Sequence, residues 1–152
     1  MALQKTLVLL KPEAVERRLV GEILARLERT GLRLAALELR TVDRDFAGQH
    51  YGEEIARKHG EKVREALLGY ISGRPVVAMV WEGNEAVAVL RAVGGEHFEP
   101  ARCPPGSIRR DYSTDSREAA NAEGRALENL IHASDSPEAA ANEVRLWFPD
   151  LG

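Results

Sequence analysis

Two patterns in the 152-residue sequence predict an α+β fold. Short apolar runs alternate with segments of helical spacing, in the order strand, helix, strand, helices, strand, helix, strand, helix. The paired strand–helix–strand units are typical of a ferredoxin-like α/β sandwich, here with a four-stranded antiparallel sheet. Neither a usable internal repeat nor a linker divides the chain, so we expect a single domain over residues 1–152.

The first half of the chain begins with a buried strand over residues 6–10. Apolar positions over residues 20–27 follow at helical spacing and predict an amphipathic helix. Residues 32–42 alternate between apolar and polar, but the phase shifts between Leu34 and Leu37. A strand that contains a β-bulge explains this shift.

Two helices are expected next, over about residues 46–58 and along the apolar stripe of residues 63–71. Residues 75–81 are apolar on both faces and predict a central strand. A helix is expected after this strand, with Asn84 suited to cap its start and Gly94-Gly95 to end it.

The last third has a weaker pattern. Prolines and polar residues over 96–128 predict an irregular loop, and residues 129–132 predict a short strand. Ser136 followed by Pro137 has the form of a helix start, with a capping residue before proline at the first helical position. We expect this last helix to reach about Phe148.

Composition restricts the function classes. With 44% hydrophobic and 30% charged residues, the chain is typical of a soluble globular protein. Its net charge of −3 argues against nucleic acid or an anionic membrane as a partner. No segment approaches the roughly 20 apolar residues of a membrane span. The lone Cys103 excludes an intramolecular disulfide, so we expect a cytoplasmic protein.

His132 is the first candidate for chemistry because it lies between a strand and a helix start. A helix N-terminus attracts anions, and a neutral imidazole is a good nucleophile. Glu143, farther along the helix, is placed to orient the ring. A histidine that only ends a strand before a capped helix explains the same spacing, so spacing alone leaves both interpretations open.

Several cationic and hydroxyl side chains suit the recognition of a triphosphate. They are Lys11, Arg91, Arg109 and Tyr51. Each alone is equally explained as an ordinary surface residue, and spacing does not show that they converge. Histidines such as His97 have no partners at metal-ligand spacing, and no Walker-type loop is present.

Five stretches, in order along nearly the whole chain, resemble the nucleoside diphosphate kinase family. They are Leu10-Lys11-Pro12-Glu13 with Val20-Gly21-Glu22-Ile23, His50-Tyr51, residues 73–83, residues 105–109, and residues 129–136 followed by Leu146-Trp147-Phe148. The last stretch, which contains His132, is the strongest.

The resemblance implies ping-pong transfer of a γ-phosphate between nucleoside tri- and diphosphates through phosphohistidine at His132, with Glu143 bonded to the ring. It implies Mg²⁺ on the nucleotide, with at most a water-mediated contact to Asp135, and a hexamer or tetramer. It assigns phosphate binding to Lys11, Tyr51, Arg91 and Arg109, and the sugar 3′-hydroxyl to Lys11 and Asn129.

The sequence also departs from the family pattern. His97 stands in place of a phosphate-contacting threonine, and Val63 aligns nearest to the phenylalanine that stacks on the base. Val63 lies on the apolar stripe of its helix and is also explained as a core residue. Residues 52–69 and 115–128 are longer than usual, which leaves His97 or an inserted side chain as an alternative cover for the base. We expect weaker nucleotide affinity than in a relative that carries the phenylalanine, and little discrimination among bases.

Three functions are compatible with these residues. The first is an active kinase of broad nucleotide specificity, and the second is a nucleotide-binding or regulatory relative with weak turnover. The third is a phosphohistidine relay that passes phosphate to a protein. The first is favoured by the phosphotransfer residues that are retained, which are His132, Lys11, Arg91, Arg109, Asn129 and Glu143.

Overall fold

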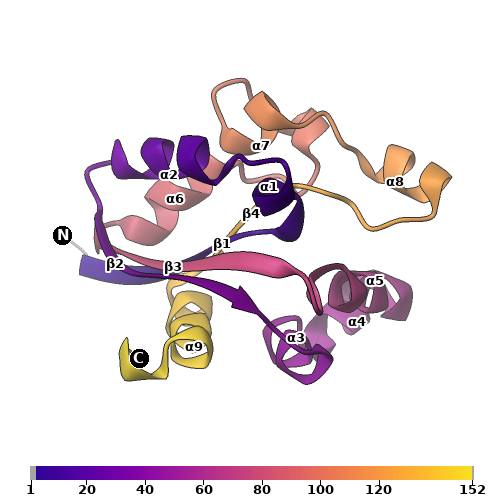
Figure 1. The fold of residues 1–152 in the computed structure, drawn as a ribbon, viewed down its shortest axis with the longest axis horizontal. Coiled ribbons are helices and arrows are strands. Elements are labelled where there is room, and N and C mark those ends of the chain that lie inside the picture. The colour runs from indigo at the N-terminus through magenta and orange to yellow at the C-terminus, as the bar shows by residue number, and fades with distance from the viewer. Residues whose placement is uncertain (1–2, 152) are drawn as a thin grey trace.

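The computed structural model describes residues 3–151 and has the expected α+β architecture (Figure 1). One antiparallel sheet has the strand order β2-β3-β1-β4. Its strands are β1 (Leu3–Leu10), β2 (Arg33–Thr41), β3 (Pro75–Asn84) and β4 (Ile131–Ala133). The prediction of a ferredoxin-like sandwich with a four-stranded antiparallel sheet is confirmed.

Helices cover both faces of the sheet (Figure 1). One face carries α1 (Pro12–Glu16), α2 (Val20–Glu28), α6 (Ala86–Gly94) and α7 (Ile108–Tyr112). The other carries α3 (Arg44–His50) and α9 (Pro137–Trp147), with α4 (Glu53–His59) and α5 (Glu61–Ile71) beside them. α8 (Arg117–Glu123) extends from the body, and short 3₁₀ turns cover Pro100–Arg102 and Pro149–Leu151.

The central strand β1 contributes side chains to two hydrophobic cores, one on each face of the sheet. Leu7 and Leu9 pack with α3, α5 and α9, whereas Val8 and Leu10 pack with α1, α2, α6 and α7. All four side chains are buried. A strand covered on both faces reads as a continuous apolar run, which is why periodicity identified it.

Two local predictions are confirmed. The β2–β3 register shifts between Leu34 and Ala36, as a β-bulge requires. The side chain of Ser136 accepts a hydrogen bond from the N–H of Ala139, which makes it the N-cap of α9.

The single helix predicted over residues 46–58 is wrong, because α3 and α4 are separate helices. Tyr51 is the C-cap of α3, with the non-helical angles φ −95° and ψ 85°, and Gly52 is the N-cap of α4. The predicted cap at Asn84 is also wrong. Asn84 remains in β3, and Glu85 takes a left-handed conformation with φ 56° before α6.

The predicted irregular stretch of residues 96–128 contains two short helices. Ser107 and Ser116 each cap one with a side-chain hydrogen bond. α8 gives no apolar stripe in the sequence because Ala120 is its one buried residue. No helix within residues 3–151 is long and apolar enough to cross a membrane.

Candidate active site

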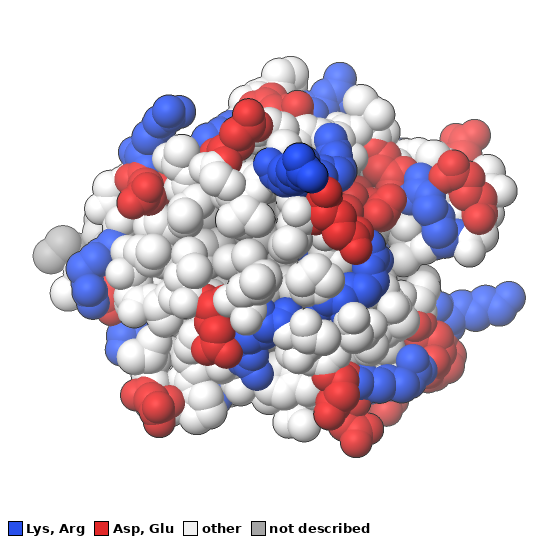
Figure 2. Space-filling model, in the orientation of Figure 1, with Lys and Arg blue, Asp and Glu red and all other residues white. Residues whose placement is uncertain are grey.

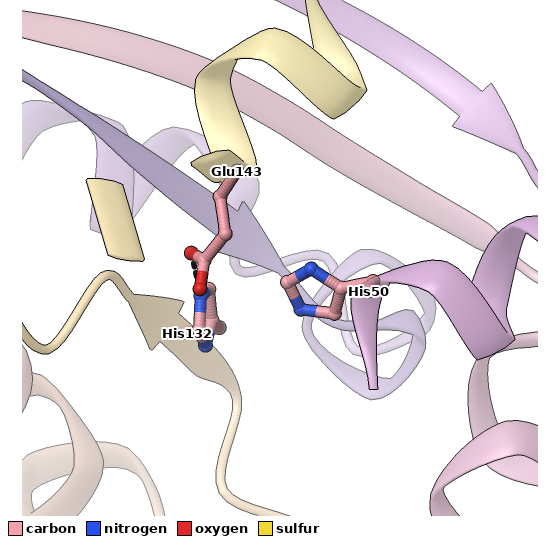
Figure 3. A group of neighbouring side chains, drawn as sticks. All are labelled: His50, His132 and Glu143. Atoms are coloured by element: carbon pink, nitrogen blue, oxygen red, sulfur yellow. Dashed lines mark hydrogen bonds and ion pairs between the residues drawn. The ribbon is translucent and has the colours of Figure 1, made fainter. Parts of the chain in front are cut away.

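His132 lies on β4 opposite Leu9 of β1, and its ring meets α9. Its Nε2 lies 2.7 Å from Oε1 of Glu143 (Figure 3). The hydroxyl of Ser134 donates to the same oxygen at 2.7 Å. A carboxylate at Nε2 fixes the tautomer that carries its proton there. The lone pair is therefore on Nδ1, and the His132 side chain is 21% exposed.

Glu143 is able to remain ionised in this setting. Burial favours the neutral carboxyl, but His132 and the hydrogen bonds from His132 and Ser134 outweigh it and lower the pKa of Glu143 to about 2. The side chain is consequently an acceptor throughout the neutral pH range.

His132 contacts α9 through Glu143, which lies beyond the first turn of that helix. Glu143 is the seventh residue of α9, about 9 Å along the axis from its start. The Ser136 side chain satisfies one N–H of the first turn, that of Ala139. We therefore expect neighbouring cations to balance an anion at the ring.

The sequence motif contained His50, but its contact with His132 was not predicted. The indole N–H of Trp147 donates to Nδ1 of His50 at 3.1 Å, which puts the His50 proton on Nε2. Burial lowers the pKa of His50 to about 3, so the ring is neutral. It stands edge-on to His132 with 4.8 Å between ring centroids and 83° between planes (Figure 3).

Within residues 3–151, one group of three potential metal ligands lies together. It comprises His50, His132 and Glu143, whose ligand atoms lie within 4.8 Å of one another. Nδ1 of His50 is occupied by Trp147, and Nε2 of His132 by Glu143. One nitrogen of each ring is thus already in a hydrogen bond. Two imidazoles also do not suit Mg²⁺, which prefers oxygen ligands.

A strained turn precedes His132. The N–H of Ile131 bonds to the carbonyl oxygen of Asn129 at 2.7 Å, and Leu130 between them has φ 71°. This is the rare classic γ-turn, which costs free energy in a non-glycine residue. β4 accordingly begins at Ile131, so the strand predicted over residues 129–132 starts two residues too early.

Lys11 and Asn129 are brought together as expected. Nζ of Lys11 donates to Oδ1 of Asn129 at 2.6 Å, and Nδ2 of Asn129 donates to the carbonyl of Phe98 at 2.8 Å. Burial, with the nearby charge of Arg109, lowers the pKa of Lys11 to about 7.

Arg109 is buried and held by carbonyl groups. It donates to Gly95 at 3.1 Å, to His97 at 2.9 Å and to Ile131 at 2.6 Å. Gly95 has φ 110°, and a Cβ there would lie 2.9 Å from Sγ of Cys103, so this close approach requires glycine. Burial lowers the pKa of Arg109 to about 10, still above neutral pH.

Tyr51 and Arg91 lie near Arg109. The Tyr51 hydroxyl and Nε of Arg109 are buried without a hydrogen-bond partner. Burial raises the pKa of Tyr51, the charge of Arg109 opposes this rise, and the charge of Glu143 adds to it. The charge of Arg91 adds to the lowering of the Arg109 pKa by burial. Arg91 also donates to the carbonyl of Glu96 at 3.1 Å.

The structure places the remaining candidates less centrally. Nδ1 of His97 accepts from the N–H of Glu99, and its ring stacks on Phe98. Val63 is half-buried on α5, and Asp135 is exposed after β4.

Known proteins resemble this chain over nearly its whole length. The family model described as nucleoside diphosphate kinase matches residues 4–151. A nucleoside diphosphate kinase of Mycobacterium sp. (strain MCS) is 46% identical over 146 residues, covering 96% of this chain and 97% of the relative.

Two solved structures share the fold. A transition-state mimic of the Borrelia burgdorferi nucleoside-diphosphate kinase, with bound vanadate and ADP, has a TM-score of 0.94 and 39% identity, covering 98% of this chain and 89% of that chain. An NDP kinase from Pyrobaculum aerophilum has a TM-score of 0.87 and 35% identity, covering 97% and 96%.

Proposed function

Because the chain belongs to the nucleoside diphosphate kinase family and is a phosphotransferase, we propose that Nδ1 of His132 carries the transferred phosphate. One observation carries this proposal. Glu143 binds Nε2 of the ring, which leaves the Nδ1 lone pair as the nucleophile.

In the first half-reaction, the Nδ1 lone pair attacks the γ-phosphorus of a nucleoside triphosphate. The P–N bond forms as the bond from phosphorus to the β,γ-bridging oxygen breaks, and that oxygen leaves with the diphosphate. Phosphorylation makes the imidazole cationic while Nε2 keeps its proton. Glu143 stabilises this positive charge through its hydrogen bond. A second diphosphate then reverses the step.

We assign the phosphates to Lys11, Tyr51, Arg91 and Arg109, and the sugar 3′-hydroxyl to Lys11 and Asn129. Two buried atoms without partners, the Tyr51 hydroxyl and Nε of Arg109, support this assignment. Each would donate a hydrogen bond to a phosphate oxygen, which relieves the cost of an unsatisfied buried polar group.

The residues of this site fit a magnesium ion that is held mainly by the nucleotide. Mg²⁺ keeps several waters and takes few carboxylates when phosphates supply oxygen ligands. Asp135 is exposed near His132 in sequence and is the residue we propose to reach the ion through water. When bound, the ion would neutralise charge between the β- and γ-phosphates.

We expect nucleotide binding to take up protons through Lys11. At pH 8 its amine is mostly neutral, since its pKa is about 7, and adjacent phosphates raise that pKa. Calorimetry of diphosphate binding in buffers of different ionisation enthalpy should show an uptake approaching one proton. Lys11→Arg stays protonated and should lose it. Equal uptake in both proteins would contradict this role.

The same lysine affects stability. Its folded pKa lies below its ordinary value of 10.5, so the unfolded chain binds more protons between about pH 7 and 10.5. The Lys11 contribution to the free energy of unfolding therefore rises with pH across that window.

We propose broad base specificity with weak base contact. Val63 on α5 gives apolar contact but no flat face, whereas a stacked aromatic is worth roughly 1–3 kcal/mol per base. A coupled assay with adenosine triphosphate and several diphosphates should give similar kcat/KM values, and Val63→Phe should lower every KM. A strong preference for one base would overturn the proposal. Absence of turnover with every diphosphate would favour the relay.

We propose a homo-oligomer, a hexamer or tetramer, that forms through β2. This strand lies at an edge of the sheet, and Leu37 and Leu39 on it are 47% and 65% exposed. Figure 2 shows a broad uncharged area, bordered by charged side chains, on the side of the molecule where β2 lies in Figure 1. Exposed edges and apolar patches of this kind favour pairing with another chain.

Static light scattering at micromolar concentration should give a mass several times 16.8 kDa, with a hexamer as the first expectation. Leu39→Lys should shift the population to smaller species. A monomer in the unaltered protein would refute the assembly.

We also propose that residues 1–152 act as one domain in the cytoplasm. One sheet joins strands from both ends of the described chain. The lone Cys103 is buried and suits a reducing compartment.

A further inference from the structure

The peptide groups of the strained turn at Leu130 are held on both sides by the segment after β1. The N–H of Leu130 donates to Oε1 of Glu13 at 2.8 Å. The carbonyl of Leu130 accepts from the backbone N–H of Lys11 at 2.8 Å. Oε1 of Glu13 also accepts from the hydroxyl of Tyr70 on α5, at 2.7 Å.

Glu13 is an unusual residue to find here. Its side chain is buried, with 6% of the residue exposed, and no ion pair within 4 Å involves it among the described residues. Burial raises its pKa. A buried acid without a direct ion pair is costly, and an acid near a phosphate site repels the ligand. The role that the structure shows for Glu13 is to accept hydrogen bonds from Leu130 and Tyr70.

We propose that Glu13 is a positioning residue for phosphotransfer, which together with Tyr70 holds the γ-turn at Leu130. The turn lies between Asn129 and the strand that carries His132, so its geometry sets both side chains. This inference rests on the phosphohistidine mechanism proposed above. It assigns Glu13 no contact with substrate.

The proposal depends on the reach of the side chain and not on its charge. Glutamine has the length of glutamate and an oxygen able to accept from both Leu130 and Tyr70. Aspartate keeps the charge but is one methylene shorter and cannot meet both donors from the same backbone. Glu13→Gln should therefore behave like the unaltered protein, and Glu13→Asp should not.

The experiment measures the single-turnover rate at which full-length protein takes label from γ-labelled adenosine triphosphate, well below the unfolding temperature. We expect Glu13→Gln to stay within about twofold of the unaltered protein and Glu13→Asp to be slower by about tenfold or more, since small misplacements of reacting groups are costly. Tyr70→Phe should also be slower. Glu16→Asp, the same shortening on the exposed end of α1, is the matched control and should not change the rate.

The outcomes separate this inference from the mechanism on which it rests. If the unaltered protein takes no label, the phosphohistidine mechanism fails. If it is labelled and Glu13→Asp is equally fast, the positioning role fails. An active Glu13→Asp beside a slow Glu13→Gln would show that charge matters rather than reach, which also overturns it. The core variant Ile23→Val is a control for stability, and we expect it to leave the labelling rate unchanged. If its thermal unfolding temperature equals that of Glu13→Asp, a general loss of stability does not explain a slower Glu13→Asp.

Discussion

We expect the His132→Ala variant to take up no phosphate from γ-labelled triphosphate and to lose turnover by at least about a thousandfold. Alanine removes the Nδ1 lone pair, which is the proposed nucleophile. Label on the unaltered protein should be lost in acid and kept in base, as a phosphoramidate bond requires. Rapid acid-free gel analysis and the coupled assay measure the two effects.

His59→Ala is the matched control, because His59 is an exposed histidine at the end of α4. It should be labelled as fully as the unaltered protein. Near-normal turnover in His132→Ala would show that another group carries the phosphate.

The second large effect is expected at Arg109. Arg109→Ala removes a buried cation from the phosphate site and leaves the carbonyls of Gly95 and Ile131 without their donor. We expect kcat/KM to fall by about a hundredfold or more. We also expect each unpaired carbonyl to lower the free energy of unfolding by about 1–3 kcal/mol.

Arg109→Lys separates these two contributions. Lysine keeps the charge but lacks the planar fork that reaches several carbonyls at once. Its kcat/KM should fall less than that of the alanine variant, while its thermal unfolding temperature should still lie below that of the unaltered protein. A folded Arg109→Ala protein with unchanged kcat/KM would remove Arg109 from the site.

Elements with strong periodicity could be predicted from the sequence. Residues 6–10 and 75–81 are apolar on both faces, and the phase shift after Leu34 marked a real bulge. Short elements could not, because α8 buries only Ala120 and α4 buries no residue fully. Their ends depend on Gly52 and on Ser116, which are common in any loop.

The site followed a similar division. The resemblance supplied His132, Glu143, Lys11 and Asn129, and the structure brings these residues together as two hydrogen-bonded pairs. The contacts of His50 with Trp147 and of Glu13 with Leu130 could not be read, since they join residues 97 and 117 positions apart. No local pattern records a meeting of that kind.

The position of the short strand β4 in the chain affects when the site forms during synthesis. This strand pairs with β1, so the hydrogen bond from Lys11 to Asn129 spans 118 residues and that from the N–H of Leu7 to the hydroxyl of Ser134 spans 127. Glu143 is supplied later still, by α9. A nascent chain on the ribosome therefore contains Lys11 long before it contains His132 and Glu143. We expect phosphate transfer to begin only after α9 has emerged and docked on the sheet.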